Sequence, residues 1–248
     1  MLSPARGRAT RYTPAVLEGI ADGERAALGL ALGRGGEDGA IEAAAQALAR
    51  AEALAEASMA AEPPGEPIAC RAGCAACCVS KVLVLAPEAL RIARHLRATL
   101  DEAALAARLA RVQGADARTR GLTRRERARA GVPCPMLDER GACSIHEVRP
   151  LVCAGWTSTD VGACERHFAA PDEVAAAPLH PPTYEIANAV LAGLGWAARE
   201  RGLDAAPLEL VAALRIALER PNAAERWLRG LPVFLAARDL EWQQALRP

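Results

Sequence analysis

Eight cysteines lie in one central part of this chain, and their types and spacing are what could do chemistry. The first four fall within nine residues, and the whole set is Cys70, Cys74, Cys77, Cys78, Cys134, Cys143, Cys153 and Cys164. Thiolates at this density are the soft donors that Zn²⁺ and iron–sulfur clusters take. We therefore predict a metal site in which all eight cysteines are candidate ligands.

The N-terminal sequence bears on the redox state of these thiols. Its first 30 residues contain no apolar stretch long enough for a signal peptide or a membrane span, because Asp, Glu and Arg interrupt every candidate. We therefore expect a cytoplasmic protein that does not associate with membranes. In a reducing compartment, clustered cysteines are more often metal ligands than disulfides.

The spacing of Cys70, Cys74 and Cys77 also matches the one that radical SAM enzymes use to hold a [4Fe–4S] cluster. Those enzymes resemble one another in having an aromatic residue before the third cysteine, and here that position is Ala76. They also need a long alternation of strands and helices downstream, which this sequence does not predict. We therefore set this class aside.

The second cysteine block supports a different resemblance. It reads CPML from Cys134, then CSIH from Cys143, then RPLVC ending at Cys153. Together with the first block it closely resembles the YkgJ-like cysteine-cluster family, whose pattern is CxxxCxxCC, then CPxL, then CxIYxxRPxxC, over about residues 66–168. His146 departs from this pattern, because the family usually has Tyr there. The resemblance implies a zinc- or iron-chelating protein, and some longer proteins resembling this pattern modify lysines in flagellin.

The number of metal centres stays open, since eight thiols supply two four-ligand sites or one multinuclear cluster. Adjacent side chains of an extended segment point to opposite sides. We therefore expect Cys77 and Cys78 to serve different metals or different atoms of one cluster, or only one of them to ligate. The second block must then return to the first across the 55 residues that separate Cys78 from Cys134. Its wide ligand gaps favour an iron–sulfur cluster, such as [4Fe–4S], over Zn²⁺.

Four other side chains near the cysteines are candidates for supporting roles. His146 and His167 lie within three residues of a cysteine, but we expect the first to replace an aromatic packing residue and the second to lie on a surface turn. Arg149 either donates hydrogen bonds to thiolate or sulfide charge or forms a surface salt bridge. Lys81, the only lysine, could offset cluster charge, although we expect it to be exposed to solvent.

The composition predicts helices around this site. Hydrophobic residues make up 52% of the chain and aromatic residues only 3%, and much of the apolar count is alanine, the best helix former. We predict a mostly α fold, in which helices flank a loop-rich, cysteine-ligated core with little or no sheet. Because acidic and basic residues balance at 30 each, we expect no nucleic-acid partner, and we interpret the arginine-rich residues 118–129 as a solvated helix face.

We divide the chain into three segments. Residues 1–64 are an N-terminal helical segment with helices at 14–33 and 38–60, residues 65–168 are the cysteine domain with a helical excursion at 87–131, and residues 169–248 are a C-terminal helical segment packed on the core. In the excursion, Pro87 suits the first turn of one helix and Asp101 caps another that ends near residue 114. Residues 82–85 form an apolar run too short to assign.

No catalytic constellation accompanies the cysteines. The sequence has no phosphate-binding glycine loop, no His/Asp pair beside a Ser, and no GxGxxG after a strand. We expect a metal-binding protein with an accessory, redox or metal-handling role and a protein partner. Two alternatives stay open: a cluster-dependent modification enzyme of the methyl-transfer type, and a structural zinc module that presents helices to a partner.

Overall fold

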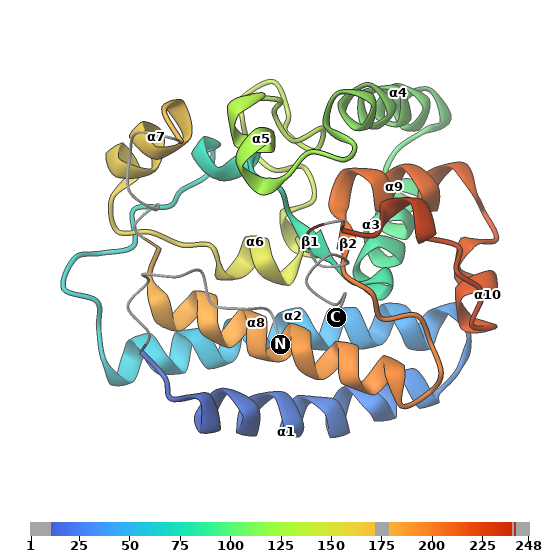
Figure 1. Ribbon diagram of the computed structural model, residues 1–248, viewed down its shortest axis with the longest axis horizontal. Coiled ribbons are helices and arrows are strands. Elements are labelled where there is room, and N and C mark those ends of the chain that lie inside the picture. The colour runs from blue at the N-terminus through green and yellow to red at the C-terminus, as the bar shows by residue number, and fades with distance from the viewer. Residues whose placement is uncertain (1–10, 172–178, 240, 242–248) are drawn as a thin grey trace.

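The computed structural model describes residues 11–171, 179–239 and 241, and these residues form a mostly helical fold (Figure 1). The α-helices are α1 (Pro14–Gly33), α2 (Gly36–Ala61), α3 (Ala86–Thr99), α4 (Glu102–Thr119), α5 (Arg124–Arg129), α6 (Leu151–Gly155), α7 (Val161–Ala169), α8 (Pro181–Arg199), α9 (Leu210–Glu219) and α10 (Ala223–Leu228). Three short 3-10 helices are η1 (Ala76–Val79), η2 (His146–Val148) and η3 (Leu235–Ala237). The predicted fold class is confirmed, since the described residues contain one sheet of two short strands.

Local signals explain where the predicted helices begin and end. Thr13 caps α1 by accepting a hydrogen bond from the Val16 amide, and Pro14 occupies the first turn, so the helix begins where the sequence predicts. Asp101 caps α4 in the same way, by accepting from Ala104 at 2.8 Å. However, α4 continues to Thr119, beyond the predicted end near residue 114. The extra turn is stabilised by packing, because Ala115 and Thr119 are buried on the side of α4 that faces α9.

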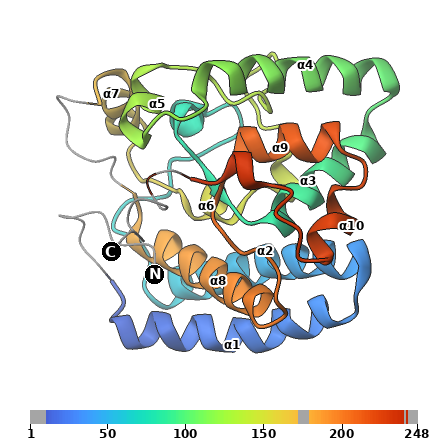
Figure 2. The ribbon, with the colours of Figure 1, turned by 45° about the vertical axis from the view of Figure 1, so that its right-hand side comes forward.

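The helices lie in layers (Figures 1 and 2). Helices α1, α2 and α8 pack together at one side, α4, α5 and α7 lie at the opposite side, and α3, α6 and α9 lie between them. Small residues allow the close approach of α1 and α8, because a Cβ atom at Gly193 would meet the carbonyl oxygen of Ala21 at 2.6 Å. The alanine-rich composition therefore serves close helix packing as well as helix propensity.

One hydrophobic core runs through these layers and draws on all three predicted segments. Its large side chains include the fully buried Trp227 and Phe234, and most of the rest are Ala, Leu, Val and Ile. Three cysteines of the second block, Cys134, Cys143 and Cys153, pack against the core at its edge. The second block is therefore anchored to the same core as the helices. The division into three segments itself stays a prediction.

The small sheet connects the cysteine run to distant parts of the chain. Strand β1 (Leu83–Val84), from the apolar run that the sequence left unassigned, pairs antiparallel with β2 (Leu208–Glu209). Beyond β2, Leu208 also forms a bridge with Arg238, and the Asp239 amide donates to the Pro207 carbonyl at 3.0 Å. The residues that follow Cys78 are therefore held beside the segment at 238–239.

In the described part of the chain, no helix combines the length and the apolar character needed to cross a membrane.

Candidate metal centre

The first cysteine block lies on a loop and one short 3-10 helix. The loop is held at Ala69, whose amide donates to the Ser158 carbonyl at 2.8 Å, and the exposed Cys70 places Sγ 3.9 Å from that same oxygen. Gly73 then turns the chain with a φ of 82°, a value that glycine adopts without the strain of a side chain. Cys77 and Cys78 follow on η1.

Cys77 and Cys78 do not point to opposite sides, so that expectation was wrong. It assumed an extended segment, whereas both residues lie in the single turn of η1 and their side chains share a hydrogen bond. This hydrogen bond lowers the pKa of the Cys77 thiol and raises that of Cys78. The two thiols are therefore direct neighbours.

The second block returns to the first, as predicted. The chain leaves Cys78 through β1 and helices α3 to α5, and the Cys134 amide then donates to the Cys78 carbonyl at 2.8 Å. The buried Arg127 supports this return, since its guanidinium donates to the Val132 carbonyl, two residues before Cys134. The excursion therefore closes on itself at the cysteines.

Two tight turns bring the blocks together. Gly141 has a φ of 75°, and a Cβ atom there would lie 3.4 Å from the carbonyl oxygen of Gly73 in the first block. The predicted turn role of glycine thus holds for Gly73 and Gly141, but Gly155 and Gly162 lie in helices. Gly155 is required for close packing instead, because a Cβ atom there would meet the Ala187 Cβ of α8 at 2.5 Å.

A buried carboxylate positions the helix that carries Cys153. Glu88 accepts hydrogen bonds from the Leu85 amide at 2.8 Å and from the Leu151 amide at 2.9 Å. It therefore joins the first turn of α3 to the first turn of α6, two residues before Cys153. Burial raises the pKa of this carboxyl to about 7. The sequence analysis missed Glu88, although its position after Pro87 at a helix start fits a capping glutamate.

Helix α7 brings the last cysteine to the first block. Asp160 caps this helix by accepting from the Ala163 amide at 2.8 Å, and α7 packs against η1. Burial raises the pKa of the Cys164 thiol, which also interacts with Ser158 and lies near Cys77 and Cys74. Ser158, a residue that the sequence analysis did not single out, thus contacts both Cys70 and Cys164.

The eight thiols fall into two adjoining groups. The outer group, defined by proximity to Cys70, is Cys70, Cys74, Cys77 and Cys164, and the inner group is Cys78, Cys134, Cys143 and Cys153. After burial, which has the largest effect, the thiols of Cys74, Cys77 and Cys164 raise the pKa of Cys70. Burial likewise raises the pKa of Cys153, with Cys134, Cys77 and Cys143 contributing next. Cys77 therefore lies where the two groups meet.

Arginine side chains surround the inner group. Burial raises the pKa of the Cys134 thiol to about 11, but the nearby Arg127 acts in the opposite direction. Burial also raises the pKa of Cys143, and Arg149 and Arg108 lower it. Because a guanidinium stays protonated, these three arginines favour thiolate in this part of the site.

The donor chemistry fits a thiophilic metal. All eight cysteines are free thiols, drawn from separate segments into one neighbourhood, and thiolate is the ligand that zinc and iron–sulfur clusters share. Across the described residues, no three His, Cys, Asp or Glu side chains are arranged so that they could hold a metal ion together. The thiols are therefore neighbours that do not form a closed coordination sphere.

The histidines differ from what the sequence led us to expect. His146 is exposed and lies 2.9 Å from the guanidinium of Arg149, so it does not occupy an aromatic packing site. His167 lies within α7 instead of on a turn, with its ring centroid 4.8 Å from that of Phe168. Arg149 combines both of its proposed roles, because it pairs with Glu52 and also lies near Cys143.

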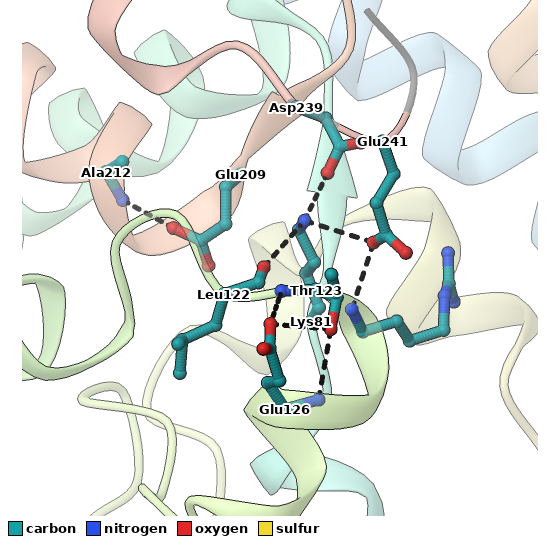
Figure 3. A network of polar contacts seen from close by, with 9 residues as sticks. Lys81, Leu122, Thr123, Glu126, Glu209, Ala212, Asp239 and Glu241 are labelled. Carbon is teal, nitrogen blue, oxygen red and sulfur yellow. Dashed lines mark hydrogen bonds and ion pairs between the residues drawn. The ribbon is translucent and has the colours of Figure 1, made fainter. Parts of the chain in front are cut away.

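Lys81 is buried, so the expectation of a solvent-exposed lysine was wrong (Figure 3). Its Nζ atom lies 2.6 Å from Asp239 Oδ2 and 3.2 Å from Glu241 Oε2, and it donates to the Leu122 carbonyl at 2.9 Å. Both carboxylates come from far along the chain, which is why local sequence did not reveal them. In the arginine-rich stretch, Arg124, Arg125 and Arg129 are exposed as expected, whereas Arg127 is buried.

Comparison with known proteins agrees with this geometry. Residues 69–173 match the family model CxxCxxCC, described as "Putative zinc- or iron-chelating domain". These residues belong to that family. The CxxCxxCC domain contains all eight cysteines, so the predicted resemblance is confirmed and metal binding is supported, with zinc and iron equally compatible. No curated protein and no solved structure matches the chain.

Proposed function

We propose that this chain is a cytoplasmic metal-handling protein that binds metal through the eight thiols of its CxxCxxCC domain. One observation carries the proposal: the fold gathers free thiols from the first block, from the return loop, from α6 and from α7 into one neighbourhood. Core packing does not require this arrangement, since a disulfide-free cluster of eight thiols is a poor way to fill an apolar core. Soft-metal coordination does require it.

An iron–sulfur cluster is the cofactor that we favour over Zn²⁺. Zinc modules usually take their ligands as two closely spaced Cys pairs, whereas here the second block supplies its thiols at wide spacing from separate loops and helices. When bound, such a cluster would supply one-electron chemistry or a transferable group, and Arg108, Arg127 and Arg149 would offset part of its negative charge. The residues that would hold it are the inner and outer thiols.

Metal analysis after anaerobic purification tests this proposal. The purified protein is expected to contain stoichiometric iron and acid-labile sulfide, with visible absorption. Colourless protein that holds zinc and no sulfide, even after reconstitution with iron and sulfide, would contradict the choice of metal. Protein that binds neither zinc nor iron would contradict the proposed function as a whole.

A pair of variants from one loop makes the test specific for thiols. Cys143→Ser should reduce the metal content, because it removes one ligand. Ser144→Ala is the matched control: it removes the hydroxyl that donates to the Met136 carbonyl at 2.8 Å and contacts Arg108, but it changes no thiol. If both variants lost the same amount of metal, the loss would reflect a disturbed loop instead of a missing ligand.

A further inference from the structure

We infer that the two thiol groups have different roles: the inner group retains metal, and the outer group is the site where metal exchanges with a thiolate-bearing partner. This inference rests on the proposed function, since it concerns the same eight cysteines. It follows from how firmly each group is attached to the hydrophobic core.

The inner group is fixed by buried structure. Cys134, Cys143 and Cys153 pack against the core, and the residues between and beside them include the fully buried Met136 and Ile145. Helix α6, which carries Cys153, buries Leu151 and Val152 and is tied to α3 through Glu88. Displacing these thiols would therefore expose core side chains, which makes local opening costly.

The outer group is attached far more weakly. Cys70 is exposed on a loop, and η1, which carries Cys77, contains no buried residue. In α7, Cys164 itself is the only buried residue. Figures 1 and 2 show α7 at the margin of the fold, away from the packed helices α1, α2 and α8. Segments with so few buried apolar contacts open locally at low free-energy cost.

Charge reinforces the difference. Arg108, Arg127 and Arg149 lie beside inner thiols and stabilise negative charge there. The strongest influences on Cys70 and Cys164 are burial, Ser158 and other thiols, so no comparable cationic support holds thiolate at the outer edge. A partner that offers thiolate ligands would therefore reach the outer group first. Cys77, which adjoins both groups, provides the connection between them.

The first test follows the release of Zn²⁺ from zinc-loaded protein to a colorimetric chelator. Two phases are expected, and the outer phase should be faster by at least about tenfold, the ratio that about 1.4 kcal/mol of opening free energy produces. Cys164→Ser should abolish the fast phase and keep the slow one, whereas Cys153→Ser should reduce the slow phase. A single release phase, or loss of the slow phase in Cys164→Ser, would overturn the inference while leaving metal binding intact.

The second test needs no variant and so does not depend on a mutant that folds. Brief alkylation of the metal-loaded wild-type protein, followed by peptide mass spectrometry, should modify Cys70 and Cys164 before Cys134, Cys143 and Cys153. Uniform modification of all eight thiols, or earlier modification of the inner group, would overturn the inference. Failure of the protein to bind any metal would instead refute the proposed function, so the two outcomes are distinguishable.

Discussion

The Nζ atom of Lys81 lies 2.6 Å from Oδ2 of Asp239, and the two side chains are only 6% and 3% exposed. This buried ion pair connects the residue three positions after Cys78 to a segment near the far end of the described chain. Glu241, which also contacts Lys81, additionally accepts from the Arg124 amide at 2.9 Å, so the start of α5 belongs to the same network. Three remote segments therefore meet at one ammonium group.

Lys81→Met is expected to lower the free energy of unfolding by about 3–5 kcal/mol, because it leaves the buried Asp239 carboxylate without its cation. Chemical denaturation measures the loss. Glu241→Gln is the control, and it should cost less than about 1 kcal/mol, since Glu241 is largely solvated. The double variant Lys81→Met/Asp239→Leu should recover much of the loss. If Lys81→Met unfolded like the wild type, the ion pair would have no structural weight.

Glu88 predicts a specific pH dependence. Its pKa rises from 4.5 to about 7 on burial, so between these values the folded protein holds a proton that the unfolded chain has released. The contribution of this carboxyl to stability is therefore greatest below about pH 4.5 and is lost as the pH rises through 7, by an amount on the order of 3 kcal/mol. The free energy of unfolding of Glu88→Gln, minus that of the wild type, should increase from pH 5 to pH 8. A difference that does not vary with pH would contradict this assignment.

Two glycines test the packing of α1 against α8. Gly193→Ala is expected to destabilise the protein by about 1–3 kcal/mol, because the new methyl group would meet the Ala21 carbonyl oxygen and the Glu24 side chain, at 2.6 and 2.7 Å. Gly23→Ala, on α1, has open space around its Cβ position and should stabilise the helix by about 0.5–1 kcal/mol. Thermal unfolding of the pair should show shifts of opposite sign. Shifts of the same sign would mean that the helices are not closely packed at Gly193.

Arg149 can be tested for its effect on thiols separately from its ion pair. Arg149→Gln removes a cation that lowers the pKa of Cys143, so metal binding should weaken most at low pH, where the thiol competes with the metal for protons. Glu52→Gln breaks the same ion pair but leaves the guanidinium in place. Chelator competition at pH 6 and pH 8 should therefore separate the two variants. Equal behaviour would show that only the surface ion pair matters.

Local sequence signals predicted much of the helical framework. The Thr13-Pro14 pair and the glycines after residue 32 define α1, and the 26 residues of α2 extend only slightly beyond the predicted 38–60. The end of α4 was missed because burial against α9 stabilises a turn that the sequence of α4 does not signal by itself. Helix boundaries that depend on a distant neighbour are not visible in a local pattern.

The site shows the same division. Cysteine density alone predicted which thiols come together, and the return of Cys134 to Cys78 followed from the need to complete the ligand set. The orientation of Cys77 and Cys78 was wrong, because the sequence does not distinguish a single 3-10 turn from an extended segment. The burial of Lys81 was also unpredictable, since its partner Glu241 lies 160 positions further along the chain.

The network around Lys81 has a consequence for the order of events during biosynthesis. While a ribosome is still translating the residues before Asp239, the Lys81 ammonium lacks the carboxylate that compensates its burial, and β2 lacks the backbone of Arg238 beside it. The cysteine run, although complete much earlier, then has no fixed base to stand on. Capture of metal in the native arrangement is therefore a late event of synthesis, and a chain truncated before Asp239 should emerge with its thiols present but poorly organised.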